Sequence, residues 1–292
     1  MARPVAKVLA IFAVLAAVLV LGALLLALRS PAQPDPLPNP NGYDDLIKAG
    51  KALQDVDYSA LQGVELRTVL SNNAAALKLA RSGLGRDSRV PLEYKPESPQ
   101  FQDLRFVKGL AQAFVAEGRL AEAESRPADA VQSYLTAMRV GQASTRGGVI
   151  IHALVGIAVE ALGLVRLEKL APTLDAKTAR ELAAALEQID SQREPVQVTL
   201  QQEHNWARRT HGLKAEILRL LPSLRKVEQV FRNRADAQAK RIQGLMIGVA
   251  AQAYQLERGQ PPANIGELVP AYLKSIPRDP STQTNASLPR VN

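Results

Sequence analysis

An uninterrupted apolar run near the amino terminus constrains this chain more than any other feature. Residues 8–28 contain no polar side chain, and a helix rising about 1.5 Å per residue would carry them across the roughly 30 Å hydrocarbon layer of a bilayer. The alternative is a cleaved signal peptide, whose apolar stretch is usually about 7 to 15 residues and ends at a small-x-small site. The nearest such site, Ser30-Pro31-Ala32, is interrupted by proline. The sequence therefore predicts a single, uncleaved transmembrane helix.

The charges that flank this run indicate its orientation. Arg3 and Lys7 precede it together with the amino-terminal amine, whereas Arg29 is the one nearby base that follows it. The cytoplasmic flanks of membrane helices carry an excess of Lys and Arg. We therefore expect residues 1–7 in the cytoplasm, residues 8–28 in the membrane and the remainder of the chain on the far side.

Residues 29–42 follow as a linker in which prolines alternate with other residues. Proline favours an extended, stiff chain, so we expect a polyproline-like stalk. Residues 43–280 form the body, and 47% of the chain is hydrophobic while only 4% is aromatic. Ala, Leu and Val must therefore fill the core, and they suit closely packed helices. We predict an all-α, multi-helix, bundle-like extramembrane domain and a disordered tail at residues 281–292.

The first part of the body combines helical patterns with a long loop. Apolar residues recur at spacings of three and four from residue 43 and again over residues 59–79, which predicts two amphipathic helices. Residues 81–100 are rich in Gly, Pro, Ser and charge. They read as a loop that is longer than most connections inside compact domains, and such loops are either binding elements or mobile.

Residues 101–141 carry the most specific local pattern. Small and aromatic side chains stand there at the spacings of a tetratricopeptide helix pair: Phe114, Gly118, Ala121, Ala130, Tyr134 and Ala137. In that pattern the small residues let two antiparallel helices touch, and the aromatics fill the space between them. The segment resembles one tetratricopeptide-like hairpin with its turn at Ser125-Arg126-Pro127. No second copy follows in register, so we expect an isolated hairpin within the helical domain.

Residues 149–167 are almost continuously apolar, which raises the alternative of a second membrane helix. His152 and Glu160 argue against it, because ionisable side chains inside a bilayer are costly. Gly156 and Gly163 lie two turns apart, a spacing that suits close contact with another helix. We predict a buried core helix.

A later segment repeats apolar residues at spacings of four and three: Leu213, Ile217, Leu220, Leu224, Val227 and Phe231. This spacing suits a seam between two helices. The seam can lie between two helices of the same bundle. The alternative is that it lies between two copies of the chain, which predicts a homodimer. Pro222 most simply starts a new helix. We expect this helix to end at Gly259, because the prolines that follow Gly259 block its continuation.

Almost all of the net positive charge falls in the same region. Residues 207–241 contain ten bases and three acids, a net charge of +7 out of +8 for the chain. These bases are either the solvated faces of helices or a strip that docks on anionic lipid headgroups or an acidic partner. The strip consists of Arg208, Arg209, Lys214, Arg219, Arg225, Lys226, Arg232 and Arg234. Only Trp206 and Phe231 are near for base stacking, so we expect no nucleic acid partner.

The sequence lacks recognisable catalytic and metal-binding motifs. It holds no cysteine and three histidines. His152 stands among apolar residues, while His204 and His211 are about two helical turns apart, too far to bind one ion without a further ligand. No nucleophile elbow, Walker loop or dinucleotide fingerprint occurs, so we predict no cofactor and no metal. Some carboxylates could pair for hydrolysis: Glu65, Glu93, Glu97, Asp103 and Glu117.

The carboxyl-terminal segment from Ala253 to Pro280 contains a short turn capped by Asn264 and Glu267. It resembles a tail found in many uncharacterised bacterial envelope proteins and, more loosely, in type II secretion pseudopilins. The membrane anchor lacks the pseudopilin processing motif, so the resemblance implies a bacterial envelope setting and not a pilin. We then expect an inner-membrane protein with an extracytoplasmic body.

Together these features predict a membrane-anchored helical interaction or scaffold subunit of a bacterial envelope assembly. The anchor, the stalk and the helical surfaces suit contacts with membrane lipid and with partner proteins. The alternative is a hydrolase of an envelope polymer that uses carboxylates near residues 81–100.

Overall fold

The computed structural model describes residues 11–22, 33–95, 99–212, 214–215, 221–278, 284–286 and 288. Within these ranges every regular element is a helix, and one isolated β-bridge joins Arg278 to Asn285. The predicted all-α fold class is confirmed. Residues 8–10 and 23–28 of the predicted anchor lie outside the described residues.

The described body consists of helices joined by turns and loops. The α-helices are α2 (Gly42–Lys51), α3 (Gly63–Asn72), α4 (Ala74–Leu84), α5 (Leu104–Ala123), α6 (Pro127–Ala143), α7 (Ile150–Leu170), α8 (Ala176–Ser191), α9 (Val196–His211) and α11 (Pro222–Arg258). Short 3-10 helices are η1 (Pro99–Asp103), η2 (Ala171–Thr173) and η3 (Ile265–Leu268). A further apolar helix, Ile11–Gly22, precedes the linker.

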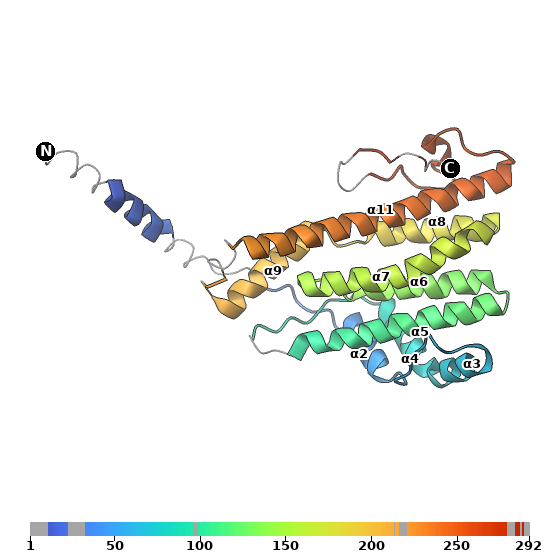
Figure 1. Ribbon diagram of the computed structural model, residues 1–292, viewed down its shortest axis with the longest axis horizontal. Coiled ribbons are helices and arrows are strands. Elements are labelled where there is room, and N and C mark those ends of the chain that lie inside the picture. The colour runs from blue at the N-terminus through green and yellow to red at the C-terminus, as the bar shows by residue number, and fades with distance from the viewer. Residues whose placement is uncertain are drawn as a thin grey trace.

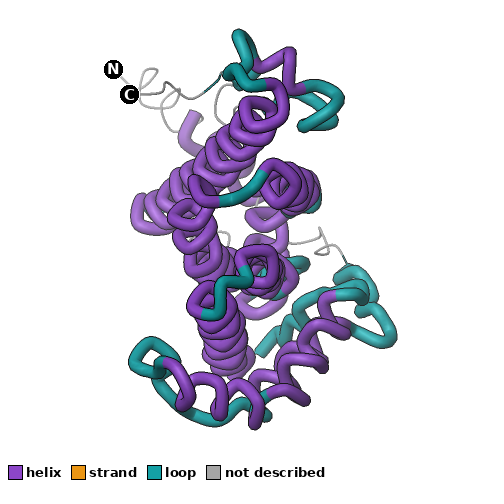
Figure 2. Tube along the Cα trace, turned by 90° about the vertical axis from the view of Figure 1, so that its right-hand side faces the viewer, coloured by secondary structure: helices purple, strands orange, loops and turns teal. Residues whose placement is uncertain are grey.

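The long helices run along the molecule as a stack (Figure 1). α5 and α6 form a hairpin, α7 packs on α6, and α11 packs on α8. The shorter α2 and α4 pair with each other, and α2 covers α5 on the side away from α11. Figure 2 looks along the long helices and shows them layered one above another. The end of α9 and the start of α11 lie together at one end of this stack (Figure 1).

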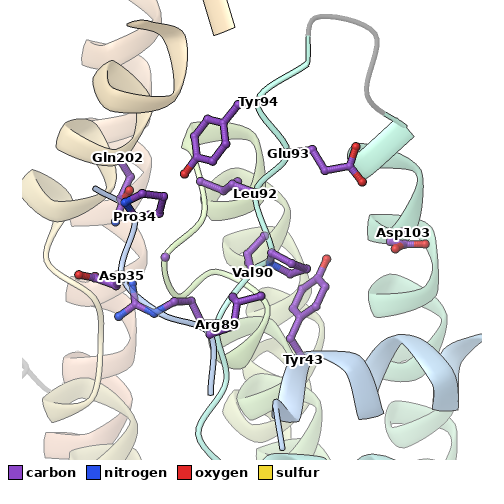
Figure 3. A pocket seen from close by; sticks show the side chains of 13 residues that line it. Pro34, Asp35, Tyr43, Arg89, Val90, Leu92, Glu93, Tyr94, Asp103 and Gln202 are labelled. Carbon is purple, nitrogen blue, oxygen red and sulfur yellow. Dashed lines mark hydrogen bonds and ion pairs between the residues drawn. The ribbon is translucent and has the colours of Figure 1, made fainter. Parts of the chain in front are cut away.

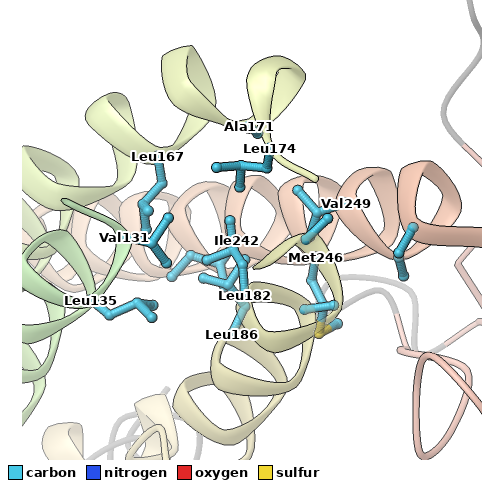
Figure 4. Packing of buried hydrophobic residues seen from close by; sticks show 14 of the residues in the cluster. Val131, Leu135, Leu167, Ala171, Leu174, Leu182, Leu186, Ile242, Met246 and Val249 are labelled. Atoms are coloured by element: carbon cyan, nitrogen blue, oxygen red, sulfur yellow. The ribbon is translucent and has the colours of Figure 1, made fainter. Parts of the chain in front are cut away.

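Two large apolar clusters hold the stack together. The first lies between α6, α7, α8 and α11 and includes Leu182 and Ile242 (Figure 4). The second lies between α2 to α7 and includes Phe114. Each fully buried side chain of this size contributes about 2 kcal/mol. A smaller cluster joins Ile150 of α7 to Phe231 of α11. Because α6 and α7 serve both large clusters, they form the shared centre of the body.

The helix pair predicted at residues 101–141 is present as α5 and α6. Pro127 begins α6 in its first turn, where the missing backbone N–H removes no helical hydrogen bond. Gly118 of α5 faces the ring of Tyr134, and an added Cβ would overlap that ring. Tyr134 is fully buried. The alternation of small and aromatic residues in the sequence therefore marks the contact between these two helices.

The helix expected over residues 59–79 differs from the prediction. It begins at Gly63 and is interrupted at Asn73, which gives α3 and α4. The buried Asn73 amide accepts a hydrogen bond from the Gln54 N–H (3.0 Å) and donates one to the Tyr58 hydroxyl (2.8 Å). An Asn side chain that bonds outside the helix competes with helical continuation. These two bonds explain the break.

The loop predicted over residues 81–100 is shorter than expected. Its first four residues are helical, because α4 continues to Leu84. Residues 85–95 run without helical structure, and η1 starts at Pro99. Residues 96–98, which include the candidate carboxylate Glu97, lie outside the described residues.

Linker residues 33–41 lie against the body. Asp35 forms an ion pair with Arg89 (2.6 Å), and the Asn41 amide donates to the Arg89 carbonyl (2.9 Å). Asn41 also caps α2 by accepting a hydrogen bond from the Tyr43 N–H (3.3 Å). This half of the predicted stalk is therefore attached to the loop that follows α4.

The carboxyl terminus returns to the body where it is described. Ala286 donates a hydrogen bond to the Pro277 carbonyl (2.8 Å). Ala286 and Leu288 pack against the first apolar cluster. These contacts differ from the disorder predicted for residues 281–292, most of which lie outside the described residues.

α7 and η2 form the one segment among the described residues that is long and apolar enough to cross a membrane by length and composition, Ile150–Thr173. Half of its most apolar stretch is buried inside the fold. His152 and Glu160 on this segment are both buried. The core helix of a soluble domain has these same properties, and the burial agrees with the predicted core helix.

Candidate functional site

The linker, the loop after α4 and α9 enclose a cavity of about 350 Å³. Figure 3 shows its lining, which includes Asp35, Tyr43, Arg89, Glu93, Asp103 and Gln202. Two carboxylates that the sequence proposed for hydrolysis, Glu93 and Asp103, line this same cavity. Glu93 comes from the loop, while Asp103 ends η1 just before α5. Both acids thus line one cavity, although they come from different segments of the chain.

An ion pair and a hydrogen bond hold the segments that carry these two acids. Asp103 forms an ion pair with Lys51 (3.3 Å). The Glu93 carbonyl accepts a hydrogen bond from the Trp206 indole N–H (2.8 Å), which fixes the loop to α9. Burial, with help from the nearby Asp103, raises the pKa of Tyr43 well above its ordinary value. The Tyr43 hydroxyl therefore stays protonated and can only donate or accept hydrogen bonds.

The two other described carboxylates of that set, Glu65 and Glu117, do not line this cavity. Glu65 lies on the exposed surface of α3. Glu117 of α5 forms an ion pair with Arg81 and accepts a hydrogen bond from the Ser133 hydroxyl (2.9 Å). Its role is structural at the α5–α6 contact. Among the described members of the set, Glu93 and Asp103 therefore remain as the candidate acid–base pair.

The histidines hold no common site in the described part of the chain. His152 is buried, accepts a hydrogen bond from the Val149 N–H (3.3 Å), and packs its ring 5.4 Å from that of Phe101. Burial lowers the pKa of His152 to about 4. His204 pairs with Glu228 at 2.9 Å. No three His, Cys, Asp or Glu side chains gather as metal ligands within the described ranges.

The predicted basic strip occupies the end of the stack where α9 meets α11. Arg208 and Arg209 lie on α9, and Lys214 follows it. Four further bases lie on the first part of α11: Arg225, Lys226, Arg232 and Arg234. The His204–Glu228 contact joins the two helices here. Arg219 lies outside the described residues.

Of the apolar seam predicted from Leu213, the structure describes Leu224, Val227 and Phe231, and it buries only the last of these within the fold. The alternative seam between two copies of the chain stays a prediction. Leu224 is 42% exposed and Val227 is 46% exposed, whereas Phe231 is buried. Among the described residues, α9 contacts this part of α11 through the His204–Glu228 pair but leaves Leu224 and Val227 exposed. Leu221 and Val230 are also exposed, at 46% and 40%. The start of α11 therefore presents apolar and basic side chains together.

A second cavity gathers side chains that sequence reasoning missed. It has a volume of about 540 Å³ and lies where α4, α6 and α8 end. Four arginines line it: Arg81, Arg86, Arg139 and Arg146. They come from segments that are some fifty residues apart, so no local motif could have announced them.

We compared the chain with protein-family models, curated proteins and solved structures. No family model matches the chain, and neither the curated proteins nor the solved structures contain a match.

Proposed function

We propose that the chain is a membrane-anchored interaction subunit of a bacterial envelope assembly, held so that the α9–α11 end of its body lies against anionic lipid. The observation that carries this proposal is the apolar surface that the fold leaves uncovered. In the helix Ile11–Gly22, eight large apolar side chains are each between 54% and 73% exposed. Water-soluble domains rarely leave such a patch uncovered, whereas a bilayer would cover it.

The path of the linker supports this orientation. Pro34 lines the same cavity as Gln202 of α9, and Figure 3 shows the two side by side. Residues 23–32 separate this point from the apolar helix, and even fully extended they reach about 40 Å at most. The α9–α11 end of the body would therefore be held near the membrane surface.

The chemistry of that end suits lipid headgroups. Interfacial segments combine Lys and Arg with apolar side chains that enter the boundary between headgroups and acyl chains. At the start of α11, Arg225 and Lys226 are exposed beside Leu224 and Val227. Each base near an anionic membrane contributes about 1 kcal/mol, so the strip would add several kcal/mol to the anchor at low salt.

The single tryptophan of the chain, Trp206 on α9, can report this contact. We expect a quencher attached to lipid headgroups to reduce Trp206 fluorescence more strongly in anionic than in neutral nanodiscs that carry the full chain. Arg225→Glu with Lys226→Glu should remove most of this difference, because the charge that holds the end down is reversed. High salt should have the same effect, since the screening length falls to about 3 Å at 1 M.

Lys48→Glu with Lys108→Glu is the matched control. Both lysines are exposed, on α2 and α5, and the pair makes the same change in net charge away from the strip. Quenching that is equal in neutral and anionic nanodiscs, or that the control reduces as much as the strip variant does, would contradict the orientation.

A hydrolase is the second candidate, favoured by the presence of Glu93 and Asp103 in one cavity. If the chain is an interaction subunit, we expect stoichiometric partner proteins to co-purify with it in mild detergent. We also expect no cleavage of envelope polymers that depends on Glu93, so Glu93→Gln should change nothing in that assay. A lone monomer that cleaves an envelope polymer, and loses about a hundredfold in rate with Glu93→Gln, would favour the hydrolase. Glu65→Gln, on the exposed surface of α3, is the control for that loss.

A further inference from the structure

The cavity of about 540 Å³ between α4, α6 and α8 has an unusual lining. Its charged side chains are all arginines, and none of its lining residues is acidic or aromatic. The polar remainder consists of Ser88, Gln132, Thr136, Gln142, Gln188 and Gln192. Guanidinium groups present paired N–H donors that match phosphate and carboxylate oxygens. The cavity thus offers positive charge and amide groups with no anion of its own.

Arg139 is the arginine that most needs an explanation. It projects from α6, is partly buried, and makes no hydrogen bond, ion pair or ring contact with any described residue. Burial lowers the pKa of Arg139, because the charged guanidinium loses contact with water. Holding this charge inside the fold is therefore unfavourable unless a partner compensates it. Buried cations are normally paired. An anion bound from outside would provide the missing partner.

The neighbouring arginines differ in how their charge is used. Arg81 pairs with Glu117 and Arg86 pairs with Asp45, both acids that do not line the cavity. Arg146 donates a long hydrogen bond of 3.5 Å to the Gln192 carbonyl. Each of these guanidinium groups has more N–H donors than these contacts use. They can therefore turn remaining donors towards a ligand.

An adjacent groove provides an internal contrast. It shares Arg81 and Gln132 with the cavity but contains its own acids. Arg126 in that groove pairs with both Glu124 and Asp129. These two carboxylates already neutralise the positive charge of Arg126 within the fold. The two hollows therefore differ in free charge, although both are lined by arginine.

The amide side chains narrow the class of ligand. Gln142 is buried, and its amide is held by a hydrogen bond to the Ile189 carbonyl (2.6 Å). The other glutamines are exposed at the rim and can exchange hydrogen bonds with hydroxyl groups. Nucleotide sites usually add an aromatic ring on which a base stacks, and this lining has none.

We propose that this cavity binds the phosphate group of a hydroxyl-bearing phosphate ester of the sugar-phosphate class, with Arg139 as its principal partner. The same chemistry occurs in soluble sugar phosphates and in the headgroups of lipids such as phosphatidylglycerol. Arg139 and Arg146 would contact the phosphate, while Gln188 and Gln192 would contact the hydroxyls.

Titration calorimetry on the full chain in neutral nanodiscs tests this site with glucose 6-phosphate as the soluble probe. We expect saturable binding that Arg139→Gln weakens by about tenfold or more, because a charge-assisted contact is lost. Arg139→Lys should restore part of the affinity, since it returns the charge without the planar fork. Arg126→Gln, in the self-neutralised groove, should leave the affinity unchanged.

A second arm separates the two sources. Nanodiscs that contain phosphatidylglycerol are compared with neutral ones by hydrogen exchange at the end of α6 and at residues 144–149. Protection that depends on Arg139 in these nanodiscs alone assigns the lipid headgroup, and binding of glucose 6-phosphate alone assigns the soluble ester. Bases near helix carboxyl ends can also serve only to neutralise carbonyl dipoles. In that case Arg139→Gln lowers the thermal stability, neither probe binds in an Arg139-dependent way, and the proposal is overturned.

Discussion

Gly141→Ala is expected to destabilise the body by about 3 kcal/mol, because it inserts a methyl group where two helices touch. An added Cβ at Gly141 would stand 2.7 Å from the Gly156 carbonyl oxygen and 2.9 Å from the Glu160 nitrogen. Both are backbone atoms of α7, so relief requires the helices to separate. Since α6 and α7 serve both large apolar clusters, that separation would loosen both.

Thermal unfolding of the full chain in mild detergent, followed by circular dichroism, measures this effect. Gly244→Ala on α11 is the matched control, because a Cβ there meets no atom within 4 Å. It should stabilise the chain by about 0.5 to 1 kcal/mol, the usual gain from replacing glycine inside a helix. A Gly141→Ala chain that unfolds at the wild-type temperature would show that the α6–α7 contact is not as close as described.

The helices were largely predictable from the sequence because local chemistry sets their ends. Asp175 caps α8 by accepting a hydrogen bond from the Thr178 N–H (2.7 Å), and Pro222 begins α11. Gly259 ends α11 with a positive φ of 77°. Each of these residues acts on a neighbour within a few positions, so its role can be read without knowing the tertiary structure.

The failures have tertiary causes. Asn73 breaks a helix because Gln54 and Tyr58 supply partners for its amide from a preceding loop. The seam around Leu224 has the right spacing for a helix pair, but spacing does not say whether the second helix comes from the same chain, and within this chain Leu224 stays exposed. The arginine cavity depends on the meeting of three helix ends, so its charge pattern is invisible along the chain. The distribution of charge predicted the basic strip because its members lie within one segment.

Arg193→Met should be the most damaging change at a charged residue, with an expected loss of about 3 to 5 kcal/mol at neutral pH. Arg193 pairs with the fully buried carboxylate of Glu160 at 3.1 Å, and Gln238 donates to the same carboxylate at 3.4 Å. Without Arg193, a charged Glu160 would stay inside the stack with one neutral partner. The measurement is again the unfolding free energy of the full chain in mild detergent.

The pH dependence of this loss identifies its cause. Burial raises the pKa of Glu160, while Arg193 opposes that rise. Removing Arg193 therefore raises the pKa further. A carboxyl whose pKa is raised on folding favours the folded state below its unfolded pKa of about 4.5, and this contribution is lost as pH rises through the folded pKa. The Arg193→Met chain should thus lose little unfolding free energy close to pH 5 and become progressively less stable towards pH 8.

Adding Glu160→Gln to Arg193→Met should recover most of the stability at pH 8 and remove the extra pH dependence, since no unpaired charge remains. A loss that is equal at both pH values, or that Glu160→Gln leaves uncorrected, would mean that Arg193 acts through packing and not through its charge.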